Sequence, residues 1–591
     1  MATEAGRVRP ARPVDYGIVA VWFALVAGAV EVATHLVRRY GFHQFTWASH
    51  HVVWMTPLSY LLLLVPPAVL VAVVAWRWPR LVPLPLLAGL YAAVVTATLL
   101  ILLTNQRLYL ASVVLVAIAV GVQVFRWSTQ SGESFRRFIR RTTPLLAAVV
   151  LAVAGISEGA WWLTERQALR RLAASDPKAP NILLLILDTV RAENLGLYGY
   201  QRPTTPMLDG FAARGAVFER AFAASSWTLQ SHASFFTGRL PNELSADFVT
   251  PLDAAPPTLA EVLRDHGYLT AGFVANHTYA SAETGLARGF IHYEDYRLTL
   301  HQVLLSSELR QIAEGGRSKM RIRDHHPTSA AVETDLALTW LSRNAGQGHP
   351  FFAFINYMDA HLPYRTPPEV VQRFVGAHPK VDGYDAAIAY LDQELGGLFR
   401  RLEASGLLAN TIVIITSDHG EQLGEHGLSD HGNSLYIQLL HVPLVVVGPG
   451  RVPAGVRVAD PVSLRDIPAT VLALAGFAGS AAMGGRSLTR YWDSTVSPGA
   501  RAESLLVAEV ARRPPGAVKM LNGAGKMWSV VGGQHHYIAS HDGSEELFNY
   551  WSDPGESIDI MNAPGAAALV APFRAEAIRV GAPARRGSSS P

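Results

Sequence analysis

Residues 182–189 of the sequence read ILLLILDT, an aliphatic run that leads directly into Asp188 and Thr189. A short continuous apolar run of this kind is typical of a strand that is buried on both faces of a parallel sheet. Two later runs have the same form, residues 351–355 (FFAFI) and 411–416 (TIVIIT). From residue 181 the sequence alternates such runs with helical patterns, which predicts an α/β fold with a mostly parallel sheet.

Polar side chains follow all three runs. The second run leads to Asn356, Asp359 and His361, and the third leads to Asp418 and His419. Ligands of open α/β sheets bind at the carboxyl ends of the strands. A single polar residue such as Asp359 can simply mark the point where a strand reaches water. Three runs that all end in Asp or His predict one shared polar site.

The first 163 residues have a different composition. Five apolar blocks are long enough to cross a bilayer, which takes about 20 residues each. A cleaved signal peptide does not fit, because the first block is long, lacks a small-residue cleavage site and is followed by four more. The sequence therefore predicts a bundle of five transmembrane helices, over residues 16–36, 52–76, 81–103, 109–125 and 144–162.

Arginines between the apolar blocks indicate the orientation. Basic residues concentrate in cytoplasmic loops, so we expect the N-terminus inside. After an odd number of spans, everything beyond residue 162 then lies outside the cytoplasm of a multi-pass plasma (inner) membrane protein. The cytoplasmic set would be Arg7, Arg9, Arg12, Arg77, Arg80, Arg126, Arg136, Arg137, Arg140 and Arg141, and the outer set Arg38, Arg39 and Arg107.

Glu31, His35 and Glu158 lie within or near the ends of apolar blocks. An ionisable residue is costly to keep in a membrane. We prefer the interpretation that these side chains reach the interface or pair inside the bundle. A path for a lipid substrate is the alternative, because all three would lie toward the outer side.

Composition sets the remaining boundaries. We expect the transmembrane domain over residues 1–163, a polar juxtamembrane linker over 164–180, the main soluble domain over 181–480, a smaller subdomain over 481–575 and a disordered tail over 576–591. Residues 297–327 are rich in Arg and His with little strand pattern. This segment either selects substrate or covers a helix.

The totals exclude several classes of function. The chain has no cysteine, so a thiol nucleophile, a zinc–thiolate site and an iron–sulfur cluster are impossible. Charged residues make up 16% of the chain, and its formal net charge is only +3. Much of the basic excess lies between apolar blocks, so we attribute it to membrane topology and expect no nucleic-acid partner.

Ordered motifs along the soluble half resemble one family. Residues 187–191 (LDTVR), 199–200 (GY) and 204–206 (TTP) resemble the opening of the sulfatase catalytic domain, and residues 227–238 (WTLQSHASFFTG) resemble its nucleophile segment. Residues 417–432 (SDHGEQLGEHGLSDHG) are similar to its second metal motif, and 546–548 (ELF) with 553–556 (DPGE) to its C-terminal part. The resemblance implies an alkaline-phosphatase-like α/β/α sandwich with a small C-terminal α+β subdomain.

The nucleophile segment departs from the sulfatase pattern. Formylglycine-dependent sulfatases carry Cys or Ser followed by x-Pro-x-Arg, whereas the matching positions here are Thr228, Gln230 and His232. Threonine cannot replace the residue that becomes formylglycine. A threonine at this position in a chain with five N-terminal spans resembles the arrangement in lipoteichoic acid synthases and lipid phosphoethanolamine transferases. This resemblance implies a covalent phospho-enzyme on Thr228. A plain helix N-cap is the alternative role for Thr228.

The resemblance also implies a metal site. Its ligands would be Asp188, Thr228, Asp418 and His419, and the metal would activate the weakly nucleophilic hydroxyl of Thr228. Calcium sulfatases supply a second Asp beside the first, but this chain has Thr189 at that place. With one fewer carboxylate and an imidazole, the set favours zinc or manganese, with calcium possible.

Four further residues are candidates for the substrate site, and His361 and His431 match family positions that contact the ester or the leaving group. His361 and His431 are candidates for the catalytic general acid and for substrate binding. His431 has a second-metal role as its alternative. Arg191 either faces the anion or forms a structural ion pair, and His232, which replaces the family arginine, is expected to make only a polar contact in the substrate site.

Together these features predict a membrane-bound metalloenzyme that cleaves or transfers a phosphate or sulfate ester group through Thr228. Its substrate would be a lipid or envelope-glycan ester, and the membrane anchor favours phosphorus head-group transfer. The alternative is sulfate-ester hydrolysis without formylglycine. A sensor or scaffold on a dead catalytic domain is weaker, because the metal set is complete. We expect a monomer.

Overall fold

The computed structural model describes residues 11–42, 45–46, 49–78, 81–104, 108–176, 178–313, 328–477, 483–501, 505–512 and 525–584. Outside these ranges lie the end of the expected tail, residues 314–327, and four of the loop arginines, Arg7, Arg9, Arg80 and Arg107. The chain forms two compact units. Unit 1 comprises Met1–Gln167 and Arg297–His325, and unit 2 comprises Ala168–Tyr296 and His326–Pro591.

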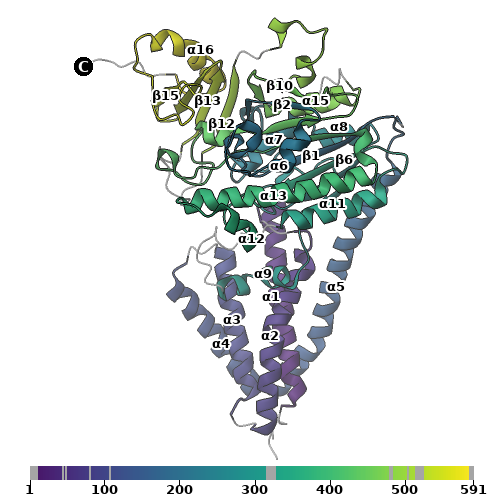
Figure 1. Cartoon of the computed structure of the whole chain (residues 1–591). Coiled ribbons are helices and arrows are strands. Elements are labelled where there is room, and N and C mark those ends of the chain that lie inside the picture. Colours follow the sequence, from purple (N-terminus) through teal and green to yellow (C-terminus); the bar gives the residue numbers. More distant parts are fainter. Residues whose placement is uncertain are drawn as a thin grey trace, which may run out of the picture. The chain divides into compact units, whose positions relative to one another are not determined.

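Unit 1 contains the five apolar helices that the sequence predicts, each long enough to cross a membrane (Figure 1). The fifth helix runs without a break through the first part of the expected linker, because residues 164–170 (TERQALR) are mostly strong helix formers. The helices are α1 (Pro13–Leu36), α2 (Val52–Arg77), α3 (Leu84–Thr104), α4 (Leu110–Gln130) and α5 (Gly132–Arg170).

Small residues let two of these helices approach closely. A Cβ atom added at Gly89 of α3 would lie 2.8 Å from the carbonyl oxygen of Gly121 on α4. Backbone contact of this kind is a usual basis of helix association in lipid, where apolar side chains gain little from leaving their surroundings.

Unit 1 also takes in a segment that follows a strand of unit 2 in the sequence. Its two short helices, α9 (Leu300–Leu305) and α10 (Glu308–Ala313), pack against α2 and α3 respectively. Two buried hydroxyls of α2 bind it, since Thr56 donates to the carbonyl of Ser306 at 3.0 Å and Ser59 to that of Leu304 at 2.8 Å. The described part of residues 297–327 therefore covers transmembrane helices.

Glu31 is buried, and both of its carboxylate oxygens are bonded inside unit 1. Its Oε2 accepts from the hydroxyl of Tyr60 at 2.7 Å, and its Oε1 accepts from the backbone N–H of Glu308 at 2.8 Å. The Nε2 atom of His35 lies 3.7 Å from Oε1. These two ionisable side chains therefore pair inside the bundle, as the preferred interpretation of the sequence has it.

Unit 2 is built around an eight-stranded sheet in the order β10-β2-β9-β7-β1-β6-β4-β5. The central strands β7, β1, β6 and β4 are parallel, whereas β9 runs antiparallel to β7 and β2, so the sheet is mixed. The strands are β1 (Asn181–Leu187), β2 (Ala216–Phe218), β4 (Leu269–Val274), β5 (His292–Glu294), β6 (Phe351–Tyr357), β7 (Thr411–Thr416), β9 (Leu444–Val447) and β10 (Val456–Val458).

Helices cover both faces of this sheet, which makes the expected α/β/α sandwich (Figure 1). Alternate residues of β1, such as Leu183 and Leu185, pack in the cluster with α6 (Pro206–Ala212), α11 (Ala330–Asn344) and α13 (Pro379–Ala404). On the other face, Phe354 of β6 packs against Phe236 of α7 (Thr228–Thr237), which contacts α8 (Leu259–Asp265) and α15 (Ile467–Leu474).

The C-terminal part forms the expected α+β subdomain. Its four antiparallel strands, β12 (Leu506–Val510), β13 (Met527–Gly532), β14 (His535–Ser540) and β15 (Glu545–Phe548), lie in sequence order, and α16 (Ala566–Arg579) packs on β13 and β14. Glu556 connects it to the main domain, because its Oε2 accepts from the N–H of Ile437 at 2.8 Å. Ile437 begins α14 (Ile437–Leu440), and this contact joins the subdomain to the chain that follows the second metal motif.

Candidate active site

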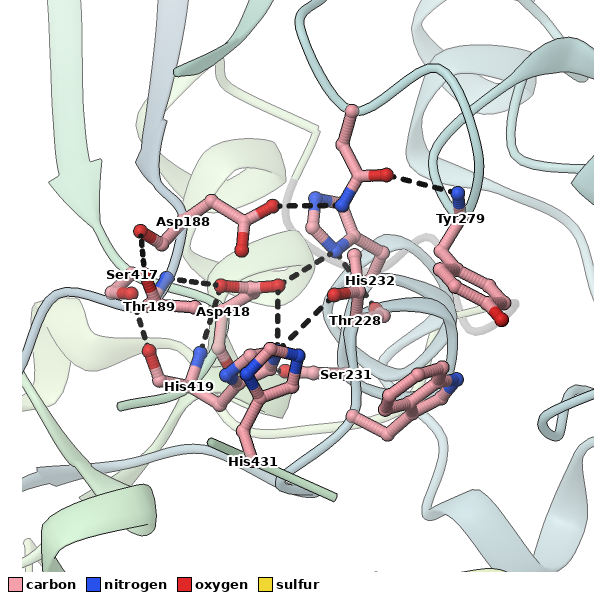
Figure 2. Close-up of polar contacts among 12 residues, drawn as sticks. Asp188, Thr189, Thr228, Ser231, His232, Tyr279, Ser417, Asp418, His419 and His431 are labelled. Carbon is pink, nitrogen blue, oxygen red and sulfur yellow. Dashed lines mark hydrogen bonds and ion pairs between the residues drawn. The ribbon is translucent and has the colours of Figure 1, made fainter. Parts of the chain in front are cut away.

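The parallel register brings the predicted site residues to one edge of the sheet. Ile186 of β1 is level with Asn356 of β6 and Thr416 of β7. Asp188, directly after β1, therefore lies beside the residues that follow β7, Asp418 and His419. Thr228 is the first residue of α7. Figure 2 shows the side chains of Asp188, Thr228, Asp418 and His419 pointing toward one another.

These four residues form a compact buried cluster. Ligand atoms of Asp188, Asp418 and His419 all lie within 4.8 Å of one another. The Oγ1 atom of Thr228 lies 3.2 Å from Nε2 of His419, and Oδ2 of Asp418 lies 3.3 Å from the same nitrogen. None of the four is more than 1% exposed. The structure thus brings the whole predicted metal set together.

Two carboxylate oxygens at the centre of the cluster have no hydrogen-bond partner among the described residues, Oδ1 of Asp188 and Oδ2 of Asp418. The other oxygen of Asp188 accepts from the side-chain amides of Asn276 at 3.0 Å and Asn356 at 3.2 Å. Buried, unpaired carboxylate oxygens are costly unless a cation neutralises them. Two carboxylates, an imidazole and a hydroxyl are a set of ligands that fits a divalent cation.

The backbone after β7 orients the imidazole of His419. Its Nδ1 lies 2.9 Å from the carbonyl oxygen of Gly420, which places the ring proton on Nδ1 and leaves Nε2 as the acceptor that faces the site. A Cβ atom at Gly420 would lie 2.0 Å from the carbonyl oxygen of Gln438, so only glycine fits there. This glycine of the SDHGE motif therefore has a steric explanation.

Thr189 holds an unusual backbone conformation beside the metal set. Its φ of +64° lies in the left-handed region, which is strained for a β-branched residue. In this conformation its N–H donates to Oδ1 of Asp418 at 3.3 Å, and its own hydroxyl donates to the carbonyl of Asp188 at 2.6 Å. Thr189 therefore positions Asp418 through its backbone, while its side chain is turned to the main chain.

The electrostatics of the cluster follow from burying two carboxylates side by side. Burial, and then the charge of Asp188, raise the pKa of Asp418 well above its usual range. Burial also opposes ionisation of Asp188, but His419 and His361 outweigh it and lower the pKa of that carboxyl. Burial, followed by His431, lowers the pKa of His419 to about 3, so its imidazole is neutral and in the form that binds metals.

His361 and His431 lie together next to this cluster. Their ring centroids are 5.0 Å apart, and the ring of His431 stacks on that of His419 at 4.5 Å. Burial opposes protonation of His431, but Asp430 and Glu421 outweigh it and raise its pKa to about 9. A protonated His431 is suited to donate a proton to a leaving group.

The second-metal alternative for His431 has structural support as well. Ligand atoms of Glu421, Asp430 and His431 also lie within 4.8 Å of one another. Nδ1 of His431 is 3.1 Å from Oδ1 of Asp430 and 3.5 Å from Oε2 of Glu421. Both the proton-donor and the metal-ligand role therefore remain for this side chain.

Arg191 is engaged in ion pairs. Its guanidinium lies 2.8 Å from Oε1 of Glu425 and 3.1 Å from Oε1 of Glu193, and its Nε donates to Asn194 at 2.9 Å. The residue is only 4% exposed. These contacts agree with the structural ion pair that the sequence offered as one role for Arg191, and not with the alternative role of facing the substrate anion.

His232 is fully buried on α7, one helical turn after the proposed nucleophile. Its Nδ1 lies 2.9 Å from the carbonyl oxygen of Thr228 and 3.6 Å from Oδ2 of Asp418. Burial lowers its pKa to about 4. The side chain therefore contacts the metal set itself, and its predicted contact with the substrate stays a prediction.

The sequence alone assigned no role to four residues of this region. Asn276 and Asn356 hold Asp188, and Glu421 and Asp430 surround His431. A signal for Asn276 existed, because it follows the apolar strand β4 just as Asp188 follows β1. Asn356 directly follows the FFAFI run, and Glu421 lies within the motif of residues 417–432.

Known proteins resemble this chain over its soluble half. Residues 180–477 match the sulfatase family model. Human iduronate 2-sulfatase is 26% identical over 351 residues, which cover 47% of this chain and 61% of that protein. The ulvan-active sulfatase of Formosa agariphila is 24% identical over 416 residues, 66% of this chain and 78% of that protein.

A solved structure agrees with the fold. The phosphonate monoester hydrolase of Agrobacterium radiobacter superposes with a TM-score of 0.54 at 20% identity, over 68% of this chain and 95% of that one. This likeness concerns the architecture alone. The family match covers half of the sequence and contains the β1 and β7 motifs and the Thr228 segment, so the chain belongs to the sulfatase family of ester-hydrolysing enzymes.

Proposed function

We propose that this chain is a membrane-bound, metal-dependent enzyme that cleaves or transfers a phosphate-containing group, with Thr228 as its nucleophile. One observation carries the proposal. The Thr228 hydroxyl lies at 3.2 Å from His419 in a fully buried set. Each of its two carboxylates has one oxygen without a hydrogen-bond partner among the described residues. Asp188, Asp418, His419 and Thr228 would hold the divalent cation. The N-terminus of α7, where Thr228 lies, favours an anionic ester.

The proposed reaction has two steps. The Oγ1 atom of Thr228 gives its proton to solvent water and bonds to phosphorus, while the bond from phosphorus to the leaving oxygen breaks. His431 or His361 gives that oxygen a proton. Water or an acceptor alcohol then gives its proton to the same histidine and bonds to phosphorus, and the bond from phosphorus to Thr228 breaks. The Thr228 oxygen regains a proton from water, and this two-step route predicts ping-pong kinetics. A bound divalent cation would supply positive charge that lowers the pKa of the hydroxyl and neutralises the ester oxygens.

The membrane unit supports a lipid or envelope-glycan ester as the substrate. Five apolar helices keep the enzyme at the membrane, where such esters are found. The excess of arginine in the alternate loops supports an extracytoplasmic position for unit 2 in the plasma (inner) membrane. An outer-side enzyme could act on lipid head groups or on envelope glycans.

Hydrolysis of a sulfate ester is the second candidate. It is favoured by the relatives, whose names describe sulfatases of iduronate and ulvan. It would have to proceed without formylglycine, because Thr228 stands at the modified position and the chain has no cysteine. This is why we place phosphorus chemistry first.

The test compares chromogenic phosphodiester, phosphomonoester and sulfate esters with the full-length chain in detergent. We expect phosphorus ester turnover that falls at least about 10³-fold in Thr228→Ala. The matched control is Thr237→Ala on the same helix, whose hydroxyl donates to the carbonyl of Ala233 at 2.7 Å and accepts from the N–H of Arg239 at 3.3 Å. A Thr228→Ala enzyme as fast as the control would contradict the proposal, and a clear preference for the sulfate ester would favour the second candidate.

A further inference from the structure

A second group of metal-ligand side chains lies in unit 1. His50 and His51 directly precede α2, and Glu158 lies on α5. Nδ1 of His51 is 2.7 Å from Oε1 of Glu158, and Nε2 of His50 is 3.9 Å from Oε2. One ligand atom from each of the three residues can be chosen so that all lie within 4.8 Å of one another.

Aromatic side chains hold this group in place. The indole N–H of Trp54 donates to Oε1 of Glu158 at 3.0 Å, and the ring of His50 stacks on Trp161 with centroids 4.9 Å apart. The rings of His50 and His51 are themselves 3.8 Å apart. Each ligand side chain is therefore oriented by a neighbour, as the ligands of a metal site usually are.

Hydrogen bonding leaves part of this group unused. Oε1 of Glu158 serves both His51 and Trp54, yet the Nε2 atom of His50 is buried and has no hydrogen-bond partner within the described ranges. A buried imidazole nitrogen without a partner is costly. An ion between His50 and the Oε2 side of Glu158 would satisfy it.

The packing of α5 gives such an ion a physical task. None of the residues in the most apolar stretch of α5 is buried in the part of the chain that the structure describes. Near the start of α5, Arg140 donates a hydrogen bond to Asp15, and the hydroxyl of Thr142 accepts one from the indole N–H of Trp22. Toward its other end Glu158 contacts the start of α2. Because apolar side chains gain little from association in lipid, polar or metal contacts at the two ends matter.

We propose that His50, His51 and Glu158 bind a divalent cation of the zinc type and join α5 to the start of α2. Two imidazoles and one carboxylate are a ligand set that zinc accepts, with a fourth position left to water. The side chains of His50 and Glu158 are 27% and 36% exposed, which lets an ion enter from solvent. This site is separate from the cluster around Thr228 and does not depend on the proposed function.

The test measures zinc in the full-length chain, purified in detergent, stripped with chelator and equilibrated with zinc. We expect Glu158→Gln to retain one zinc fewer per chain than the wild type by elemental mass spectrometry, because the amide can still accept from Trp54 but is a poor zinc ligand. Glu133→Gln is the matched control, an exposed glutamate in the first turn of the same helix. It should retain as much zinc as the wild type.

A second variant guards against a folding effect. His50→Gln removes a nitrogen that makes no hydrogen bond among the described residues, and it should lose the same single zinc. Zinc should raise the Tm of the wild type more than that of either variant. Each variant should also lose one zinc per chain when combined with Asp418→Asn. That result would show that the lost zinc is not bound at the Thr228 cluster. Equal zinc content in the wild type and in either variant would overturn the proposal.

Discussion

The two units bury carboxylates in opposite ways. Glu31 of unit 1 has both oxygens bonded, one to the Tyr60 hydroxyl and one to the Glu308 N–H. Asp418 of unit 2 is as deeply buried, but its Oδ2 lies free of hydrogen bonds among the described residues and close to the second carboxylate, Asp188. A buried carboxylate with both oxygens hydrogen-bonded indicates a structural role. A pair of buried carboxylates with free hydrogen-bonding capacity indicates a site that is built for a cation.

The His50–His51–Glu158 group lies between these two cases. One oxygen of Glu158 accepts two hydrogen bonds, as in a structural contact. Nε2 of His50 has no hydrogen-bond partner in the described part of the chain, as in a ligand site. The same criterion therefore distinguishes three polar clusters of one chain.

The largest effect is expected for Asp418→Asn. Loss of a metal ligand should lower turnover by about 10³-fold or more. The stability of the metal-free chain should not fall, and should rise by up to roughly 2 kcal/mol, because the substitution removes repulsion from Asp188. Turnover and the Tm of chelator-treated protein measure the two effects. A clear loss of Tm would mean that Asp418 is a structural residue like Glu31.

Metal exchange comes next. Chelation should abolish turnover, and zinc or manganese should restore it at least about tenfold better than calcium, because the set holds an imidazole and only two carboxylates. Activity of chelated protein with each added ion measures this. Full recovery with calcium alone would show that the ligand argument misjudges the site.

Glu31→Leu should destabilise unit 1. It leaves the Tyr60 hydroxyl and the Glu308 N–H without their buried acceptor, at about 1–3 kcal/mol for each group. Faster hydrogen exchange over α9 and α10 and a lower Tm of the full chain should report it, whereas Glu31→Gln should cost less. Unchanged hydrogen exchange over α9 and α10 in Glu31→Leu would show that Glu31 has no structural role.

The smallest effect is expected for Ser59→Ala, which deletes the hydrogen bonds of Ser59 to the carbonyl of Leu304 and to the hydroxyl of Ser307. A loss of about 1 kcal/mol should appear as faster exchange confined to α9. Thr129→Ala is the matched control, because that hydroxyl donates to the carbonyl of Phe125 within its own helix. Equal exchange of α9 in the two variants would show that Ser59 does not hold this segment.

Much of the fold could be predicted from the sequence, because its signals are local. Hydropathy alone located the five apolar helices, and apolar runs that end in Asp or His located β1, β6 and β7. The same strand-end argument brought Asp188, Asp418 and His419 together. Thr228 was found from the resemblance of its segment, since a threonine that begins a helix is ordinarily only a cap.

Other features depend on long-range contacts, which no local pattern carries. Residues 300–313 have neither the length nor the hydropathy of a span, so their packing against α2 and α3 could not be predicted. Asn276 reaches Asp188 across 88 positions, and polar residues after strands are common. The antiparallel direction of β9 leaves no mark in its short apolar run.

The most direct test of the central claim is peptide mass spectrometry of the metal-loaded full chain after incubation with envelope phospholipids. We predict a phosphorus-containing adduct on Thr228, absent from Thr228→Ala, whose mass identifies the transferred group. Adduct-free Thr228 together with undiminished ester turnover by Thr228→Ala would contradict the account.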